Sequence, residues 1–207
     1  MYNQSKNQCI HKYRKIPVHH DNFVDNFILK SIEFLEPFIL SVTNTPNYVT
    51  IFRIVAFLCV SILFYQSKTR TNAVVFIVGF FVNYYLDCLD GYLARRCKKM
   101  SQLGDFLDHF ADFISSVIML YFLYPLNVAD TIIVTFLCFM AAIHMGNQQH
   151  YYSQRKQEKG ESKMTESLDI LMYISEKIKI PIEFTRFFGT GSSVLGVMLI
   201  FSKKYIM

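Results

Sequence analysis

Apolar residues gather into long blocks along this 207-residue chain. Five blocks contain few charged side chains and approach the roughly 20 residues that a helix needs to cross about 30 Å of hydrocarbon. A weaker block at residues 168–182 carries four charged side chains, so a sixth span and an amphipathic surface helix both fit it. The pattern predicts an all-α, polytopic membrane helix bundle of about six transmembrane helices. The five stronger blocks cover residues 48–65, 73–93, 106–124, 131–145 and 187–201.

The region before the first block has a different pattern. Residues 1–22 are mostly polar and contain no apolar run of signal-peptide type. Over residues 23–42, apolar positions recur at helical spacing between charged ones, which is typical of an amphipathic helix lying in the membrane surface. Packing of this helix against the bundle is an equal alternative. We divide the chain into a cytosolic N-terminal segment with this juxtamembrane helix, residues 1–47, and a transmembrane domain, residues 48–207.

Composition supports a membrane protein. The chain is 52% hydrophobic and contains 20 phenylalanines and 13 tyrosines. Its net charge of +5 suits attraction to anionic lipid head groups, and no nucleic-acid-binding motif is present. We therefore expect membrane lipids as partners and no nucleic acid. The five cysteines lie at irregular spacings, which predicts neither a disulfide framework nor a paired-cysteine metal site.

Lysine and arginine residues orient the predicted spans. With a cytosolic N-terminus and six crossings, fifteen of them lie on the cytosolic side, and four lie in the opposite loops. The positive-inside rule favours this orientation. It predicts a multi-pass protein of the endoplasmic reticulum or a similar internal membrane, with residues 86–113 at the cytosolic face. The four residues of the opposite loops are Lys68, Arg70, Lys177 and Lys179.

Four aspartates interrupt one of the most apolar parts of the chain, at Asp87, Asp90, Asp108 and Asp112. Residues three or four apart share a helix face, so two carboxylate pairs face each other if their helices are antiparallel neighbours. Each aspartate costs about 2.5 to 3.5 kcal/mol at mid-membrane, and all-oxygen ligation suits Mg²⁺ or Mn²⁺. The aspartates therefore predict a divalent-metal site. Simple pairing with the basic residues of positions 95–99 is the alternative.

Small residues and one arginine accompany the aspartates. Gly91 and Ala94 follow Asp90 by one and four positions, where a flat base or ribose could approach the backbone. Gly104 begins the next helix, where free N–H groups favour phosphate, and Arg95 can form a fork to phosphate. Glycine and alanine commonly serve helix packing in membranes. Only their combination with aspartates and arginine predicts a nucleotide site.

These positions together resemble the signature of the class-I CDP-alcohol phosphatidyltransferases. All eight fixed positions match, and residues 45–53, TPNYVTIFR, are similar to that family's entry into its first span. The resemblance implies that a hydroxyl attacks the β-phosphorus of a CDP-linked donor and that CMP leaves. It leaves open whether the acceptor is a lipid or a small alcohol, and whether the protein is a homodimer. The match reads Asp87-x2-Asp90-Gly91-x2-Ala94-Arg95-x8-Gly104-x3-Asp108-x3-Asp112.

The resemblance also implies roles for individual residues. The four aspartates would hold two Mg²⁺ or Mn²⁺ ions that neutralise charge on the departing CMP, and Asp112 would also take the proton of the acceptor. Asn47 and Thr50 would add donor contacts from the first span. The remaining donor-binding positions would be Gly91, Ala94, Arg95, Ser101 and Gly104.

Details of the motif favour one branch of that family. Residues 94–96, 103–112 and 148–167 are similar to choline and ethanolamine phosphotransferases, which use CDP-choline or CDP-ethanolamine with diacylglycerol. In that branch His109 and Glu166 would relay a proton. The chain length suits the alternative, CDP-diacylglycerol-dependent synthases of the phosphatidylinositol or phosphatidylglycerophosphate type. A metal-binding membrane protein and an inactive family member are the non-enzyme alternatives.

Overall fold

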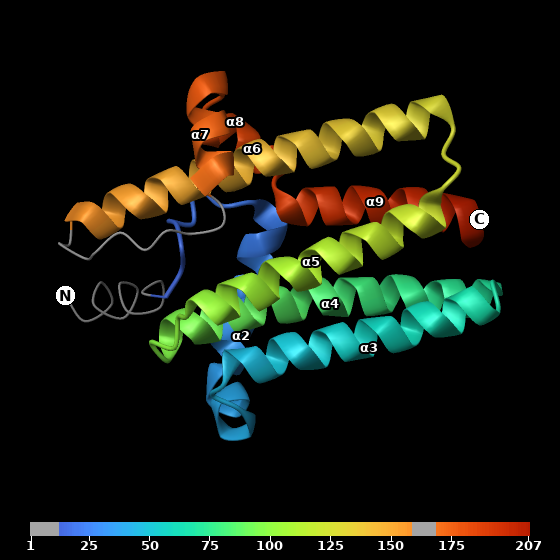
Figure 1. The fold of residues 1–207 in the computed structure, drawn as a ribbon, viewed down its shortest axis with the longest axis horizontal. Coiled ribbons are helices and arrows are strands. Elements are labelled where there is room, and N and C mark those ends of the chain that lie inside the picture. Colours follow the sequence, from blue (N-terminus) through green and yellow to red (C-terminus); the bar gives the residue numbers. More distant parts are fainter. Residues whose placement is uncertain (1–12, 159–168) are drawn as a thin grey trace.

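The computed structural model describes residues 13–158 and 169–207, which form helices joined by short connections (Figure 1). Five segments within these residues are long and apolar enough to cross a membrane. The predicted all-α membrane bundle is therefore confirmed. The segments are α3 (Pro46–Gln66), α4 (Arg70–Arg96), α5 (Gln102–Leu123), Val128–Gln154 of α6 (Val128–Glu158), and Ile182–Tyr205, which comprises α8 (Ile182–Thr185), the 3-10 turn η1 (Arg186–Phe188) and α9 (Thr190–Tyr205).

The predicted count of about six spans is one too high for the described residues. The weaker apolar block forms only α7 (Asp169–Ile178), whose ten residues reach about 15 Å, half the hydrocarbon thickness. Lys179 then turns the chain with a φ of 58°, and Pro181 is the N-cap residue of α8. The helix packs on α6, because a Cβ at Gly146 would stand 2.3 Å from the Leu171 carbonyl oxygen. The block is thus a short amphipathic helix.

The spanning helices run along the long axis of the molecule in alternating directions, and α2 (Phe23–Val42) crosses one end of the bundle (Figure 1). With five crossings, α9 ends at the opposite end from α2. This corrects the side assigned to two pairs of basic residues. Lys203 and Lys204 lie at the end opposite α2, whereas Lys177 and Lys179 lie at the same end as α2.

Helix α2 has two different faces. Ile28 and Ile32 are buried against the bundle, where Arg96 of α4 also donates to Glu36 at 2.6 Å. Phe34 and Phe38, on the outer face, are 84% and 69% exposed. The helix therefore packs on the bundle and also presents apolar rings outward, so it combines features of both predicted arrangements.

Phenylalanines pack the other end of the bundle. Phe64 of α3 is completely buried, and its ring lies 5.2 Å from Phe76 of α4, 4.9 Å from Phe122 of α5 and 5.4 Å from Phe201 of α9. Such aromatic contacts supply large contact areas in preferred geometries. They fix how α3, α4 and α5 lie relative to one another, and hence where the polar ends of these helices meet.

Candidate active site

The polar ends of α4 and α5 bring the four predicted aspartates together. Asp87 and Asp90 lie in the last turns of α4, and Asp108 and Asp112 lie in the N-terminal half of α5. Carboxylate oxygens of Asp87, Asp90 and Asp108 all lie within 4.8 Å of one another. The exposed fraction of the side chain rises from 4% at Asp90 to 47% at Asp112. The cluster is therefore closed at Asp90 and open at Asp112.

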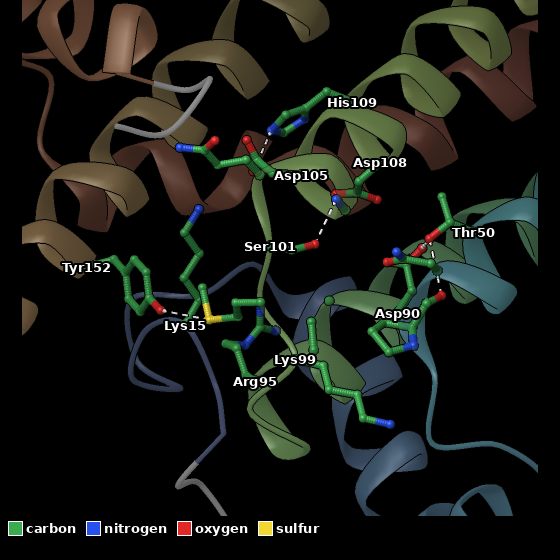
Figure 2. A pocket seen from close by; sticks show the side chains of 17 residues that line it. Lys15, Thr50, Asp90, Arg95, Lys99, Ser101, Asp105, Asp108, His109 and Tyr152 are labelled. Atoms are coloured by element: carbon green, nitrogen blue, oxygen red, sulfur yellow. Dashed lines mark hydrogen bonds and ion pairs between the residues drawn. The ribbon is translucent and has the colours of Figure 1, made fainter. Parts of the chain in front are cut away.

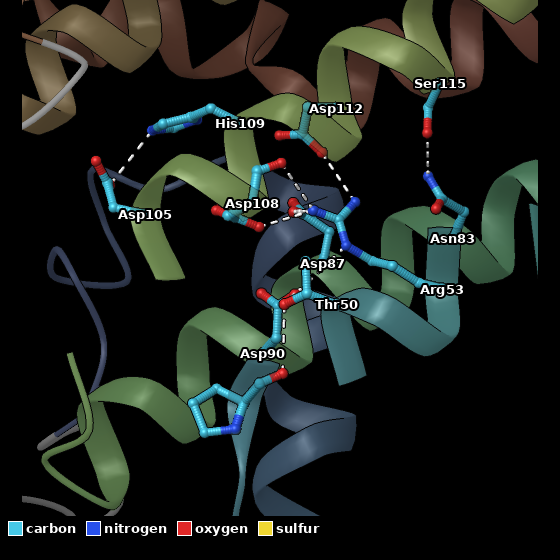
Figure 3. A network of polar contacts seen from close by, with 11 residues as sticks. Thr50, Arg53, Asn83, Asp87, Asp90, Asp105, Asp108, His109, Asp112 and Ser115 are labelled. Atoms are coloured by element: carbon cyan, nitrogen blue, oxygen red, sulfur yellow. Dashed lines mark hydrogen bonds and ion pairs between the residues drawn. The ribbon is translucent and has the colours of Figure 1, made fainter. Parts of the chain in front are cut away.

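Arg53 of α3 stands at the centre of the aspartates and contacts all four (Figure 3). Its side chain is completely buried. Nη2 lies 2.8 Å from Asp87 Oδ1 and 2.7 Å from Asp108 Oδ1. Nη1 lies 2.9 Å from Asp112 Oδ1, and Nε lies 3.3 Å from Asp90 Oδ2. The basic partner thus comes from the first span, and not from positions 95–99.

Arg53 was missed as a site residue, although the sequence carries a signal for it. It is the charged residue of α3, whose other positions are apolar or neutral. An ionisable residue within a membrane span marks a functional site by default, and its partner should be sought. Arg53 also follows Thr50 by three positions and so shares a helix face with it.

The carboxylates fit divalent metal ions. Oxygens on opposite sides of an octahedral Mg²⁺ stand about 4.2 Å apart, since each bond measures about 2.1 Å. A spread of 4.8 Å among Asp87, Asp90 and Asp108 needs only small side-chain rotations to reach that geometry. Arg53 supplies one positive charge against four carboxylates, which leaves a negative excess that divalent ions would neutralise.

A cavity of about 170 Å³ opens beside the aspartates, between the ends of α3, α4 and α5 (Figure 2). Most of the predicted site residues line it. Asp87 and Asp112 are not among its lining residues but contact Arg53 (Figure 3). Glu166 lies outside the described residues. The predicted residues that line the cavity are Asn47, Thr50, Asp90, Gly91, Ala94, Arg95, Ser101, Gly104, Asp108 and His109.

Several lining residues also shape the cavity. Thr50 Oγ1 donates to Asp90 Oδ2 at 2.7 Å, which orients this carboxylate. Ser101 caps α5 by accepting the Gly104 N–H at 3.0 Å. A Cβ at Gly104 would stand 3.0 Å from Asn47 Oδ1 and 3.1 Å from Ser101 Oγ. Glycine at this position therefore lets α3 and α5 begin close together.

Arg95 takes a position that the sequence did not predict. Its Nε donates to the Tyr13 carbonyl oxygen at 2.7 Å. Its guanidinium folds back over Gly91, where a Cβ would stand 3.4 Å from Nη1. The space that glycine leaves is thus filled by this arginine, although both residues still line the cavity.

His109 points away from the aspartates at the centre of the site (Figure 3). Its Nε2 lies 3.5 Å from Asp105 Oδ1, one helical turn earlier, and its side chain is 28% exposed. Because Glu166 lies outside the described residues, the relay between these two residues stays a prediction.

Three relatives share part of the chain. A CDP-diacylglycerol–glycerol-3-phosphate 3-phosphatidyltransferase of Blochmanniella floridana is 38% identical over 71 residues, which are 34% of this chain and 37% of that protein. The protein of the same name from Haemophilus influenzae is 40% identical over 73 residues, 33% of this chain and 37% of its own. The archaetidylinositol phosphate synthase of Pyrococcus horikoshii is 33% identical over 94 residues, 45% of this chain and 48% of its own.

The chain thus spans less than half the length of each of these relatives. Their names agree with the alternative head-group prediction, not with the choline or ethanolamine branch that the motif details favoured. No solved structure matches the chain. The model of the CDP-alcohol phosphatidyltransferase family matches residues 43–198, which include every described aspartate of the cluster. This chain belongs to the CDP-alcohol phosphatidyltransferase family.

Proposed function

We propose that this chain transfers a phosphatidyl group from CDP-diacylglycerol to the hydroxyl of a small phosphorylated alcohol, with release of CMP. The observation that carries the proposal is the convergence of four motif carboxylates beside a cavity lined by the other motif residues. The names of two relatives support CDP-diacylglycerol as the donor and make glycerol 3-phosphate the first acceptor to test. An inositol phosphate acceptor is the second candidate.

The proposed reaction is a direct displacement at phosphorus. The acceptor oxygen forms a bond to the β-phosphorus, the bond from that phosphorus to the bridging oxygen breaks, and CMP departs with the electron pair. Asp112 is the carboxylate we assign to accept the hydroxyl proton, because its side chain is the most exposed of the four. Arg53 holds its Oδ1 at 2.9 Å and so fixes its orientation.

The four clustered aspartates would also hold two divalent ions. Asp87, Asp90, Asp108 and Asp112 are the ligands we assign to Mg²⁺ or Mn²⁺. Such ions, when bound, supply Lewis-acid stabilisation of the charge on the diphosphate. We infer that Arg53 acts as the counter-cation of these carboxylates before the ions enter, because it contacts all four at 3.3 Å or less.

We place the cavity on the cytosolic side of the membrane. With five crossings, eleven lysines and arginines of the described residues lie at the α2 end, against Lys68, Arg70, Lys203 and Lys204 at the other end. This distribution follows the positive-inside rule. Single cysteines at Ser101 and Asn127, in an otherwise cysteine-free chain, should react with impermeant reagents from opposite sides. Labelling from the same side would contradict the helix count or the orientation.

The function is tested by offering both substrate classes to the purified protein with Mg²⁺. One reaction contains CDP-diacylglycerol with glycerol 3-phosphate, or with an inositol phosphate, and the other contains CDP-choline with diacylglycerol. We expect CMP and a phospholipid product only in the first. Product only in the second would overturn the donor class, and product in neither would favour an inactive family member.

A further inference from the structure

A neutral polar pair lies one helical turn further into the bundle than the aspartates. Asn83 Nδ2 of α4 donates to Ser115 Oγ of α5 at 3.1 Å (Figure 3). Both residues are 5% exposed. Asn83 precedes Asp87 by four positions and Ser115 follows Asp112 by three, so each shares a helix face with an aspartate of the cluster. The pair therefore extends the two facing rows of carboxylates by one more polar level.

The next turn beyond this pair is apolar. Phe80 of α4 precedes Asn83 by three positions, and Met119 of α5 follows Ser115 by four. Both Phe80 and Met119 are buried and belong to the apolar cluster that contains Phe64. The Asn83–Ser115 pair thus stands at the boundary between the apolar core and the charged cluster.

Two kinds of contact join α4 to α5 at this boundary. Arg53 of α3 bridges Asp87 and Asp112, at 2.8 Å and 2.9 Å, so its link depends on charge. The Asn83–Ser115 hydrogen bond joins two neutral side chains directly, and its burial makes it stronger than the same bond in water. The carboxylates of the two helices repel each other. The hydrogen bond opposes this separation without changing the charge of the site.

Asn83 is poorly suited to packing alone. Its Oδ1 is buried and accepts no hydrogen bond from the part of the chain that the structure describes. A buried amide oxygen without a partner lowers stability, whereas apolar groups of the same shape in place of both partners can be neutral or stabilising. Apolar contact is non-directional, however, while a hydrogen bond fixes the distance between its two atoms. The pair therefore contributes a defined helix separation more than it contributes stability.

We propose that Asn83 and Ser115 are positioning residues of the metal site. Their hydrogen bond fixes the separation of α4 and α5, and with it the separation of the carboxylates on the two helices. The inference rests on the proposed function, in which the four aspartates hold divalent ions. Mg²⁺ tolerates little change in its ligands, because it requires a nearly octahedral arrangement at about 2.1 Å, whereas Ca²⁺ accepts a more flexible geometry at about 2.3 to 2.6 Å. Loss of the bond should therefore weaken Mg²⁺ binding more than Ca²⁺ binding.

The test compares Asn83→Leu, Ser115→Ala and the double variant. An electron paramagnetic resonance titration measures Mn²⁺ binding, and displacement of Mn²⁺ by Mg²⁺ or Ca²⁺ gives the affinities for these two ions. Mg²⁺ affinity should fall by about tenfold in each variant, as is typical when a residue that orients metal ligands is replaced. Because both residues serve one bond, the double variant should lose no more than either single variant. Its melting temperature in a chelator should change little.

Ser61→Ala is the matched control for Ser115→Ala. Ser61 of α3 is also 5% exposed, but its hydroxyl donates within its own helix, to the Phe57 carbonyl oxygen at 2.6 Å. The control should keep the Mg²⁺ affinity of the wild type. Should Asn83→Leu fail to fold, Ser115→Ala, which removes a single oxygen atom, decides the matter alone.

Unchanged Mg²⁺ affinity in Ser115→Ala would overturn the proposal. An equal loss for Mg²⁺ and Ca²⁺, or losses that add up in the double variant, would also overturn it and would assign the two residues to packing. A wild-type protein that binds Mg²⁺ but shows no turnover would contradict the proposed function, whereas the affinities would still decide the role of Asn83 and Ser115.

Discussion

The two ends of the helix bundle are built by the same helices from opposite kinds of side chain. At one end, α3, α4 and α5 pack Phe64, Phe76 and Phe122 into a core that α9 completes. At the other end, the same three helices bring Arg53 together with four aspartates. The first end is stabilised by contact area, and the second depends on charges that compensate one another.

We expect side chains at the aromatic end to serve stability and the aspartates at the other end to serve function. A buried ring contributes through its many contacts, so its loss should lower stability and leave the chemistry intact. A buried carboxylate that contacts one arginine, and that we propose as a metal ligand, contributes through its charge, so its neutral isostere should fold and yet fail to react. Neutral isosteres of the aspartates and truncations of the buried rings should therefore have opposite consequences for folding and for turnover.

The largest effect is expected for Asp87→Asn. The amide keeps the shape of the side chain but removes a charged oxygen from the candidate metal site, so turnover should fall by about a thousandfold or more. The melting temperature should change little, because Arg53 keeps three carboxylate partners. Turnover is measured at saturating Mg²⁺ and Mn²⁺.

Asp105→Asn is the matched control for that variant. Asp105 lies on α5 and lines the cavity but is not one of the three clustered metal-ligand candidates. It should retain most of the activity. Near-wild-type turnover in Asp87→Asn, or in the equivalent Asp90→Asn and Asp108→Asn variants, would rule out these aspartates as essential metal ligands.

The next effect concerns the cation at the centre of the site. Arg53→Met leaves four carboxylates without their counter-charge, and breaking a buried ion pair costs about 3 to 5 kcal/mol. We therefore expect a large fall in melting temperature in the presence of a chelator. Mn²⁺ should restore most of the stability and should bind more tightly than in the wild type, because no guanidinium competes for the carboxylates.

Melting curves with and without Mn²⁺ measure the stability, and an electron paramagnetic resonance titration measures Mn²⁺ binding without reference to turnover. Arg53→Lys, which keeps the charge but loses the fork of donors, should be intermediate in both. An equal loss of stability in chelator and in Mn²⁺ would show that Arg53 supports packing alone.

A comparable loss of stability is expected from Phe64→Ala at the aromatic end. Removing a completely buried phenylalanine costs about 3 to 5 kcal/mol. Turnover per folded molecule should stay near that of the wild type, since the ring lies among the apolar ends of the helices. Phe34→Ala, at an outward position that is 84% exposed, is the control and should lower the melting temperature little. A strong loss of turnover in folded Phe64→Ala would mean that the two ends are coupled.

The two ends also differ in how far they could be predicted. The aspartates are specified by their spacing, so the sequence predicts both the helix faces and their meeting. The partner of the aspartates was not predicted, because Arg53 and Asp112 are far apart in the sequence and only the packing of α3 on α5 joins them. The position of Lys15 in the cavity lining could not be predicted for the same reason, since only the tertiary contacts of residues 13–22 bring it there.

The sequence specifies the number of spans less clearly than it specifies the aspartate cluster. Hydrophobicity alone does not separate a short amphipathic helix from a weak span, and α7 contains both apolar and charged residues. What ends α7 is a left-handed turn at Lys179 followed by Pro181, and of these two residue types only proline signals a helix end in the sequence. The sequence left a span and an amphipathic helix both open for this block, and the structure has the amphipathic helix.

The smallest effect is expected for His109→Ala. If the chain resembled a choline or ethanolamine phosphotransferase, His109 would take the proton of diacylglycerol, and its loss would cost about a hundredfold or more. The structure directs this imidazole toward Asp105 at 3.5 Å, and two of the relatives are named as CDP-diacylglycerol-dependent enzymes. Turnover with glycerol 3-phosphate should therefore fall only a few-fold. Asp112→Asn, three positions along the same helix, should lose nearly all activity in the same assay. A hundredfold loss in His109→Ala with Asp112→Asn still active would transfer the role of base from the aspartate to the histidine.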